Sequence, residues 1–335
     1  MLSSARPVLV TGATGFLGGH VIRALEAEGI PTIASGRDAV ALQRLVTSGG
    51  TVRASLDELA DVRRDVDAVV HCAALSTPWG RPRDVAHANV EGTRAALSFA
   101  ERNGARRLVF VSSPSVYAAA RDRIGLREGD VAPGKPLNDY IRSKLAAEEL
   151  LRRAQREGRI AELVILRPRG LIGRGDPSLV PRLVQVHRRI GIPLFDGGRN
   201  LIDVTAVENV AFALRLALTR GDPAGGVYNI SNGEPRPFRA LLEQLFRRLG
   251  EEPRFRTMPR RAAWALAATC EAVCRALPGR PEPPLTRYTL STIAFAQTLD
   301  ISRAVDELGY RPAFSLDHAL DGAAADVLER LGEGG

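Results

Sequence analysis

The sequence predicts an α/β protein: a Rossmann-type doubly wound parallel sheet, followed by a smaller, mostly helical substrate-binding part. Two observations predict this class. In the first half of the chain, short apolar runs alternate with longer helix-like runs, and a glycine-rich turn follows the first apolar run directly. Most of these apolar runs are nearly continuous, as expected where both faces of a sheet are buried. The predicted strands are residues 7–11, 30–35, 68–72, 108–112 and 163–167.

Helices are predicted between these strands, each ending at or near a glycine that suits a left-handed helix end. They cover residues 16–28, 84–102 and 138–157. Beyond residue 167 the pattern loosens into loops rich in proline and glycine. Further strands are predicted at 202–207 and 226–230, and further helices at 235–250 and 262–277.

These elements predict two units. Residues 1–168, with 203–230 returning to them, form a dinucleotide-binding domain. Residues 169–202 and 231–330 form a substrate-binding or lid domain.

Composition limits the classes of protein. The chain has 335 residues, of which 45% are hydrophobic and 25% charged, as in a globular protein without long disorder. No apolar run is long enough to span a membrane and no signal layout opens the chain, so we expect a cytoplasmic protein. The net charge is +8, but the arginines are scattered and nucleic acid is not an expected partner. The three cysteines form no metal-ligand framework, so no metal is expected.

The turn after the first strand predicts dinucleotide binding. In such a turn the first glycine permits a tight bend, the second lets the backbone approach a pyrophosphate and the third allows close helix–sheet packing. An ordinary strand-to-helix turn is the alternative reading. The cofactor-binding candidates here are Gly12, Thr14, Gly15, Phe16, Leu17 and Gly18.

The end of the second strand bears on cofactor choice. An acidic residue in this region binds a free ribose 2′-hydroxyl, whereas an arginine is able to pair with a 2′-phosphate. Arg37 precedes Asp38 and follows a glycine, which favours NADP(H), with NAD(H) possible. The alternative is a solvated Arg37 with Asp38 capping the next helix.

Tyr140 and Lys144 are four residues apart, which places both side chains on one face of a predicted helix. A phenol is a poor acid–base catalyst at neutral pH, and a nearby ammonium lowers its pKa. Only two of the 46 basic residues are lysines, so the retention of Lys144 argues against chance. Ser113 lies at the carboxyl end of the fourth strand, where open parallel sheets bind ligands, and its hydroxyl is able to hold a substrate oxygen.

Together these motifs resemble the extended short-chain dehydrogenase/reductase family. The resemblance implies that Tyr140 is the acid–base group, that Lys144 binds the nicotinamide ribose and lowers the tyrosine pKa, and that Ser113 orients the substrate oxygen. It further implies that Asn89 supports the site from its helix. Other residues would border the cofactor by the same matching: Ala73, Ala74, Pro168 and Gly170.

Departures from the sugar-nucleotide members narrow the chemistry. Pro114 and Ser115 replace the Asp-Glu pair of the dehydratases, so elimination is not expected. Ile202 replaces an arginine that grips a diphosphate in epimerases, although Arg199 or Arg169 is able to compensate.

The chain instead resembles the branch that contains 3β-hydroxysteroid dehydrogenases and 2-alkyl-3-oxoalkanoate reductases. This implies a hydrophobic ketone or alcohol substrate, with Ser115, Arg169 and Arg199 as candidate contacts. The apolar helix 262–277 fits a lid or a shallow peripheral membrane contact, but equally a buried or oligomer-facing helix.

We therefore expect an NAD(P)(H)-dependent oxidoreductase that interconverts a secondary alcohol and a ketone. An epimerase with no net redox change and a non-catalytic dinucleotide-binding regulator remain the alternatives. Because helices 84–102 and 138–157 resemble those of four-helix interfaces in the family, a homodimer is expected.

Overall fold

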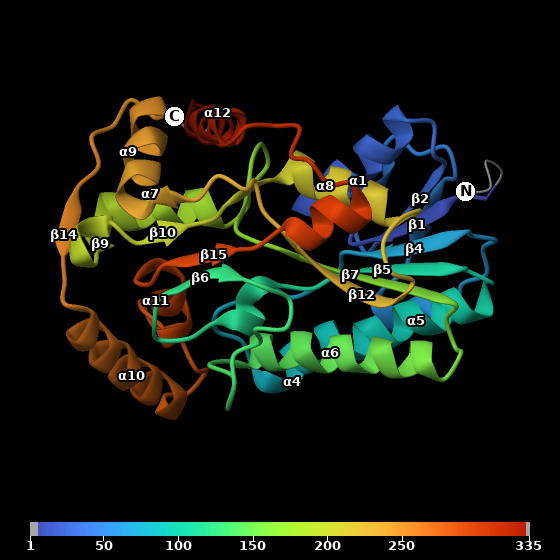
Figure 1. Cartoon of the computed structure of the whole chain (residues 1–335), viewed down its shortest axis with the longest axis horizontal. Coiled ribbons are helices and arrows are strands. Elements are labelled where there is room, and N and C mark those ends of the chain that lie inside the picture. Colours follow the sequence, from blue (N-terminus) through green and yellow to red (C-terminus); the bar gives the residue numbers. More distant parts are fainter. Residues whose placement is uncertain (1–5, 333–335) are drawn as a thin grey trace.

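The computed structural model describes residues 6–332 and is built around a seven-stranded sheet (Figure 1). The strand order is β12-β7-β5-β4-β1-β2-β3, and every neighbouring pair is parallel. The order reverses between β1 and β4, which is where such sheets bind ligands. The strands are β1 (Val8–Thr11), β2 (Thr32–Gly36), β3 (Thr51–Arg53), β4 (Ala68–His71), β5 (Arg107–Val111), β7 (Glu162–Pro168) and β12 (Ala224–Ile230).

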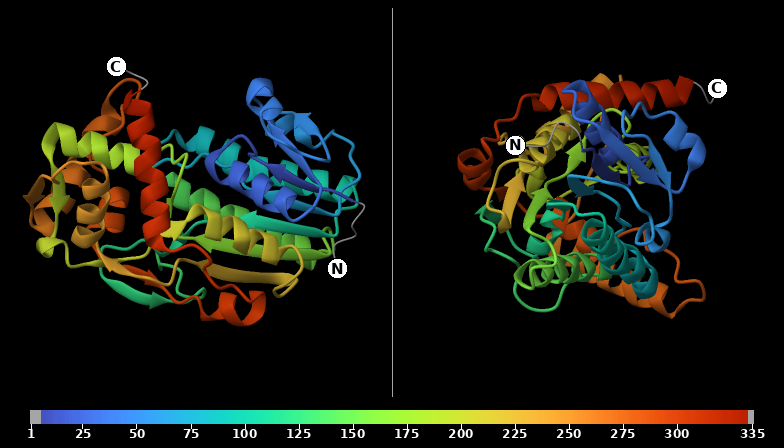
Figure 2. Two further views of the ribbon diagram at one scale, coloured as in Figure 1. Left: turned by 90° about the horizontal axis from the view of Figure 1, so that it is seen from above. Right: turned by 90° about the vertical axis from the view of Figure 1, so that its right-hand side faces the viewer.

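Helices cover both faces of this sheet, and its central strands are therefore buried throughout. On one face, α1 (Phe16–Ala27) and α8 (Val207–Ala217) pack into an apolar core with β1 and β7. The other face carries α5 (Gly92–Arg102) and α6 (Asp139–Arg156), as Figure 2 shows from two further directions. The shorter helical elements of this half are α2 (Ala39–Gln43), α3 (Leu56–Leu59), α4 (Pro82–Ala86), π-helical η1 (His87–Glu91) and 3₁₀-helical η2 (Pro114–Tyr117).

The C-terminal half is mainly helical and has its own apolar cores. Most of its helices lie at the end of the molecule opposite β1 and β2 (Figure 1), and α12 runs across the junction (Figure 2). They are α7 (Leu179–Ile190), η3 (Asp196–Gly198), α9 (Phe238–Arg248), α10 (Arg260–Ala276), α11 (Arg287–Ile293), η4 (Ala304–Leu308) and α12 (Leu316–Gly332). The short strands are β6 (Arg123–Leu126), β8 (Leu171–Ile172), β9 (Ile192–Leu194), β10 (Leu201–Ile202), β11 (Thr205–Ala206), β13 (Arg236–Pro237), β14 (Phe255–Thr257) and β15 (Gln297–Leu299).

The predicted long elements are present, with two corrections. The strand predicted at 202–207 is two short strands, β10 and β11, which belong to different sheets, and Val207 already begins α8. A short apolar run is consistent with a buried strand or with a buried helix, and this run forms the end of β10, the whole of β11 and the start of α8. The helix predicted at 84–102 contains the π-helical segment η1. Within residues 6–332 no helix is both long and apolar enough to cross a membrane.

Candidate active site

The glycine turn between β1 and α1 is fixed by steric contact. Gly12 has φ +66°, and a Cβ there would lie 2.9 Å from the Cα of Ala73. A Cβ on Gly18 would lie 2.1 Å from the carbonyl oxygen of Gly12, so α1 packs directly on the turn. Both positions therefore require glycine. Ala73 follows β4 and borders the turn, and its contact with the cofactor stays a prediction.

The first turn of α1 offers backbone N–H groups to an anion. Gly15 is its N-cap, no side chain caps the helix, and no acidic residue lies in its first turn. The positive end of a helix with free N–H groups attracts phosphate. Leu17 packs against the sheet core, so only its backbone is available. The glycine turn and the N-terminus of α1 therefore fit a pyrophosphate.

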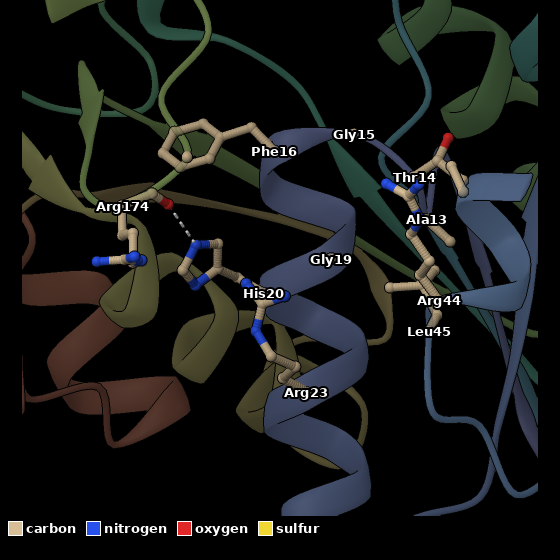
Figure 3. A pocket seen from close by; sticks show the side chains of 12 residues that line it. Ala13, Thr14, Gly15, Phe16, Gly19, His20, Arg23, Arg44, Leu45 and Arg174 are labelled. Carbon is tan, nitrogen blue, oxygen red and sulfur yellow. Dashed lines mark hydrogen bonds between the residues drawn. The ribbon is translucent and has the colours of Figure 1, made fainter. Parts of the chain in front are cut away.

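Two hollows adjoin this turn. One, of about 450 Å³, is lined by Thr14, Arg37 and Asp38. The other, of about 270 Å³, lies beside the first turns of α1 (Figure 3). Its lining is Ala13, Thr14, Gly15, Phe16, Gly19, His20, Arg23, Ala41, Arg44, Leu45, Arg174 and Gly175.

Charge around these hollows is positive. The exposed residues Arg23, Arg37 and Arg44 form no ion pair with any other residue in the range 6–332. In Figure 3, Arg23 projects from α1 and Arg44 lies across the hollow, on the side of Thr14. Asp38 caps α2, since its Oδ1 accepts from the backbone N–H of Val40 at 3.0 Å. Asp38 therefore has the capping role considered from the sequence, and Arg37 nonetheless lines the larger hollow.

Tyr140 lies in the first turn of α6, a helix that begins where the Asn138 side chain accepts from the Ile141 N–H at 2.9 Å. Ser113 follows β5, and its hydroxyl accepts from the N–H of Ser115 at 3.2 Å. Burial raises the pKa of Tyr140, while the neighbouring hydroxyls of Ser113 and Ser76 act to lower it. The fold thus brings the predicted tyrosine and serine together.

The surroundings of Lys144 differ from one expectation, namely that its charge lowers the pKa of Tyr140. Its Nζ donates to the backbone carbonyl of Val111 at 2.8 Å and lies 4.9 Å from the ring centroid of Phe110. Burial lowers the pKa of Lys144 to about 8, and Cys72 and Glu148 counteract this effect. Lowering of the Tyr140 pKa by Lys144 was expected, but in this structure burial dominates and the pKa of Tyr140 is raised.

Asn89 lies in the π-helical segment η1 and is buried. Its Oδ1 accepts from the N–H of Leu75 at 2.7 Å, and its Nδ2 donates to the Leu75 carbonyl and to Ser143 Oγ at 3.1 and 2.9 Å. Asn89 therefore connects the loop after β4 to α6, between Tyr140 and Lys144. π-Helical segments are frequent at functional sites.

A buried ionic network lies beneath these residues. Glu148, one turn after Lys144, accepts from Ser112 Oγ at 2.6 Å and from Arg167 Nε and Nη2 at 2.8 and 2.6 Å. Arg167 Nη1 also donates to the Tyr117 hydroxyl at 2.7 Å. Burial acts to raise the pKa of Glu148, but the hydrogen bonds and charge of Arg167 outweigh it and hold the pKa below its ordinary value. The network joins α6, β5 and β7 under the site.

The three substrate candidates differ in placement. Ser115 and Arg169 are buried, at 3% and 6% exposed, whereas Arg199 is exposed at the end of η3. Ile202 lies in the apolar core of the C-terminal half. Tyr288 on α11 was not identified from the sequence, yet its ring centroid lies 6.5 Å from that of Tyr140.

The remaining candidates border the same edge of the sheet. Pro168 is the last residue of β7, and Gly170 has φ +51°. A Cβ at Gly170 would lie 3.3 Å from the Asp203 carbonyl oxygen, so the loop after β7 is held close to the following segment. Ala74 is exposed beside Ala73. Phe16 lines the smaller hollow and stacks edge-on with His20 (Figure 3).

Comparison with known proteins places this geometry in a family. Residues 8–231 match the model of the NAD dependent epimerase/dehydratase family. The chain belongs to that family. It is an oxidoreductase-type enzyme of the extended short-chain dehydrogenase/reductase class, in its 3β-hydroxysteroid dehydrogenase-like branch, acting on CH–OH groups.

Curated relatives of the family match nearly the whole chain. An uncharacterised protein of Escherichia coli, YbjS, is 36% identical over 95% of this chain and 96% of its own length. A 2-alkyl-3-oxoalkanoate reductase of Stenotrophomonas maltophilia is 34% identical over 93% and 97%. A ketoreductase of Stigmatella aurantiaca, named for a 4-hydroxy-2-methyl-3-oxo-4-farnesyl-3,4-dihydroquinoline-1-oxide, is 31% identical over 93% and 94%.

Solved structures share the fold. The UDP-glucose 4-epimerase of Thermotoga maritima superposes with a TM-score of 0.74 at 21% identity, covering 97% of this chain and 99% of that one. MoeE5, in complex with UDP-glucuronic acid and NAD, gives a TM-score of 0.75 at 24% identity with the same coverage.

Proposed function

We propose that this enzyme is an NADP(H)-preferring oxidoreductase that interconverts a ketone and a secondary alcohol on a hydrophobic 3-oxo or 3-hydroxy acid or a hydroxysteroid. The observation that carries the proposal is the meeting of Ser113 and Tyr140 at the sheet edge that also carries the glycine turn, with Lys144 anchored one helical turn away. A non-catalytic regulator needs only the turn, so this set favours an enzyme.

The mechanism follows from the buried hydroxyls. Tyr140 gives its hydroxyl proton to the ketone oxygen during reduction and takes it back during oxidation. Ser113 donates a hydrogen bond to the same oxygen and stabilises the negative charge that develops on it. The dinucleotide, when bound, supplies or accepts the hydride at the carbon. Lys144 would hold the nicotinamide ribose, since its bond to the Val111 carbonyl uses only one of its three N–H donors.

The preference for NADP(H) rests on charge. Arg37 lines the larger hollow, and Arg23 and Arg44 line the adjoining one. A ribose 2′-phosphate would neutralise these guanidinium groups, which form no ion pair within residues 6–332. Arg37→Gln is expected to lower kcat/KM with NADPH roughly 10- to 100-fold and leave that with NADH nearly unchanged. An equal loss with both cofactors would contradict the assignment.

The substrate class rests on the relatives and on α10. Two relatives are named for 3-oxo substrates that carry an alkyl or farnesyl chain. Helix α10 exposes Leu266 and Val273, and the adjoining Leu277 is also exposed. Such a helix would serve as a lid over a greasy substrate or touch a membrane surface.

The reaction is tested with the purified chain, NADPH and a panel of 2-alkyl-3-oxoalkanoates, neutral 3-ketones and 3-oxosteroids, followed by the absorbance of the reduced nicotinamide. Tyr140→Phe is expected to lower kcat at least roughly 100-fold while cofactor binding is retained. Reduction at the parental rate by Tyr140→Phe would exclude its role.

The epimerase alternative makes a different prediction, because it needs an oxidised cofactor that is retained through the cycle. Co-purified NAD and no net reduction of any ketone would favour it.

We also propose a homodimer through the α4–α5 and α6 region. Sedimentation as a monomer at micromolar concentration would exclude that assembly.

A further inference from the structure

Arg169 is a buried cation that has no hydrogen-bond or ion-pair partner for its side chain among residues 6–332. Its side chain follows β7 and is 6% exposed. Within residues 6–332, none of its guanidinium N–H groups donates a hydrogen bond, and its Nε is fully enclosed. No carboxylate oxygen of the same residues lies within 4.0 Å of its nitrogens. An unpaired buried charge is strongly destabilising, so this arrangement calls for an anionic ligand.

The groups around Arg169 are polar, and two of them also lack partners. Burial lowers the pKa of Arg169, and Tyr288 and Asp203 counteract this. Asp203 forms no ion pair with Arg169: within residues 6–332 its Oδ2 accepts from the Leu299 N–H at 2.7 Å and its Oδ1 has no hydrogen-bond partner. The Ser115 hydroxyl, 3% exposed, meets no hydrogen-bond partner by distance and angle within residues 6–332, and it lies close enough to Tyr288 to act on its pKa.

This cluster adjoins the reacting groups. Tyr288 packs on Tyr140 with ring centroids 6.5 Å apart. Ser115 lies in the same 3₁₀ turn as Ser113, and its N–H donates to the Ser113 hydroxyl at 3.2 Å. A substrate oxygen held by Ser113 and Tyr140 would therefore have the unpaired donors close by.

We infer that Arg169, with the hydroxyls of Ser115 and Tyr288, binds the carboxylate of a 3-oxo or 3-hydroxy acid whose C3 oxygen is held by Ser113 and Tyr140. This inference rests on the proposed function and deepens it, because it selects acids over neutral ketones and steroids. In such acids a single carbon separates the carbinol or ketone carbon from the carboxyl carbon, which matches adjoining anion and carbonyl subsites.

The surroundings favour a carboxylate over a diphosphate. A single guanidinium forms a fork that matches one carboxylate. A diphosphate needs further cations, but the nearby Asp203 is a carboxyl group and Ile202 is apolar. The hydroxyls of Ser115 and Tyr288 supply neutral donors to the remaining lone pairs of a carboxylate.

The test is a calorimetric titration of the purified full-length chain, loaded with NADPH, with a 2-alkyl-3-hydroxyalkanoic acid and with its primary amide. A hydroxy acid does not react with the reduced cofactor, so binding is measured without turnover. We expect the acid to bind roughly 10- to 100-fold more tightly than the amide. Equal affinities, or no binding of the acid, would overturn the inference.

Arg169→Met is expected to abolish the preference for the acid, and Arg189→Met, a matched change at an exposed arginine of α7, is expected to retain it. A preference that persists in Arg169→Met overturns the inference. If Arg169→Met does not fold, Ser115→Ala replaces it, with a several-fold loss expected for the acid alone. The comparison of acid and amide on the unmodified chain tests the inference without any variant.

Failure of this inference and failure of the proposed function are distinguishable. Reduction of neutral ketones without preference for acids would overturn the carboxylate site and leave the oxidoreductase proposal standing. Acid binding through Arg169 without hydride transfer to any ketone would support the site and contradict the proposed reaction.

Discussion

Replacement of Glu148 by glutamine tests how much the buried ionic network beneath the active site stabilises the fold. The carboxylate receives hydrogen bonds from Ser112, Arg167 and Arg152, at 2.6 to 2.9 Å. Glutamine keeps the shape of the side chain but removes the charge. It leaves Arg167, which is 2% exposed, without its carboxylate partner.

The magnitude follows from the burial of the pair. Removing one partner of a buried ion pair lowers the free energy of unfolding by about 3–5 kcal/mol, because the remaining charge is uncompensated. For 335 residues, an unfolding entropy of about 2.1 cal/mol/K per residue amounts to about 0.7 kcal/mol/K. Glu148→Gln is therefore expected to lower Tm by roughly 4–7 °C.

Differential scanning calorimetry measures this shift, and a double-mutant cycle isolates the pair. Glu148→Leu combined with Arg167→Met removes both charges, so the double variant is expected to lose less stability than the two single changes added together. Glu149→Gln, at a neighbouring position whose side chain is 65% exposed, is the matched control. A Tm for Glu148→Gln within about 1 °C of the parent, or additive single changes, would refute the reasoning.

Three further predictions follow from contacts and pKa values. Gly18→Ala would place a Cβ 2.1 Å from the Gly12 carbonyl oxygen, so it is expected to weaken cofactor binding severely and to destabilise the chain by about 1–3 kcal/mol or more. In Gly19→Ala the nearest atoms to the new Cβ would lie 3.6 Å away, so the stability of this variant is expected to be unchanged or raised. Calorimetry of both variants with and without the dinucleotide makes the comparison. The pKa of Lys144 is about 8 in the folded chain and about 10.4 in the unfolded chain, so between these pH values the unfolded state binds more protons and stability rises with pH. In urea unfolding, the parent is expected to gain up to about 1.4 kcal/mol of stability per pH unit relative to Lys144→Met. Parallel plots of unfolding free energy against pH for the two proteins would contradict this. Burial, with a smaller effect from Lys144, lowers the pKa of His71 to about 3, so the stability that neutral His71 contributes is lost as pH falls from about 6.5 toward 3. In His71→Gln, the stability measured by circular dichroism is expected to fall less steeply with pH in that range. An unchanged dependence of stability on pH would count against a neutral His71.

The sequence was sufficient to predict six of the seven strands of the main sheet, but not the short edge strand β3, and to predict which residues follow the strand ends. The glycine turn, Ser113 and the Tyr140–Lys144 pair are each set by local spacing relative to one strand or helix, and a parallel sheet brings such strand ends to one edge. Glu148 was also accessible in principle, since it lies four residues after Lys144 on the same helix.

The substrate side was less accessible because it depends on chain segments that are distant in sequence. Tyr288 reaches Tyr140 from α11, and no periodicity near residue 140 indicates that contact. The direction of the Tyr140 pKa also escaped prediction. Spacing indicated a nearby ammonium, but the balance between charge and burial depends on tertiary packing.

The position of β12 in the sheet has a consequence for synthesis of the chain on the ribosome. β12 pairs with β7 along residues 224–230, so β7 lacks its outer neighbour until those residues have emerged. During that interval, β7 presents unpaired backbone N–H and C=O groups, and its apolar side chains are only partly covered. A nascent chain that stalls before residue 230 would be a substrate for chaperones, and the first 168 residues produced alone would be prone to edge-to-edge aggregation.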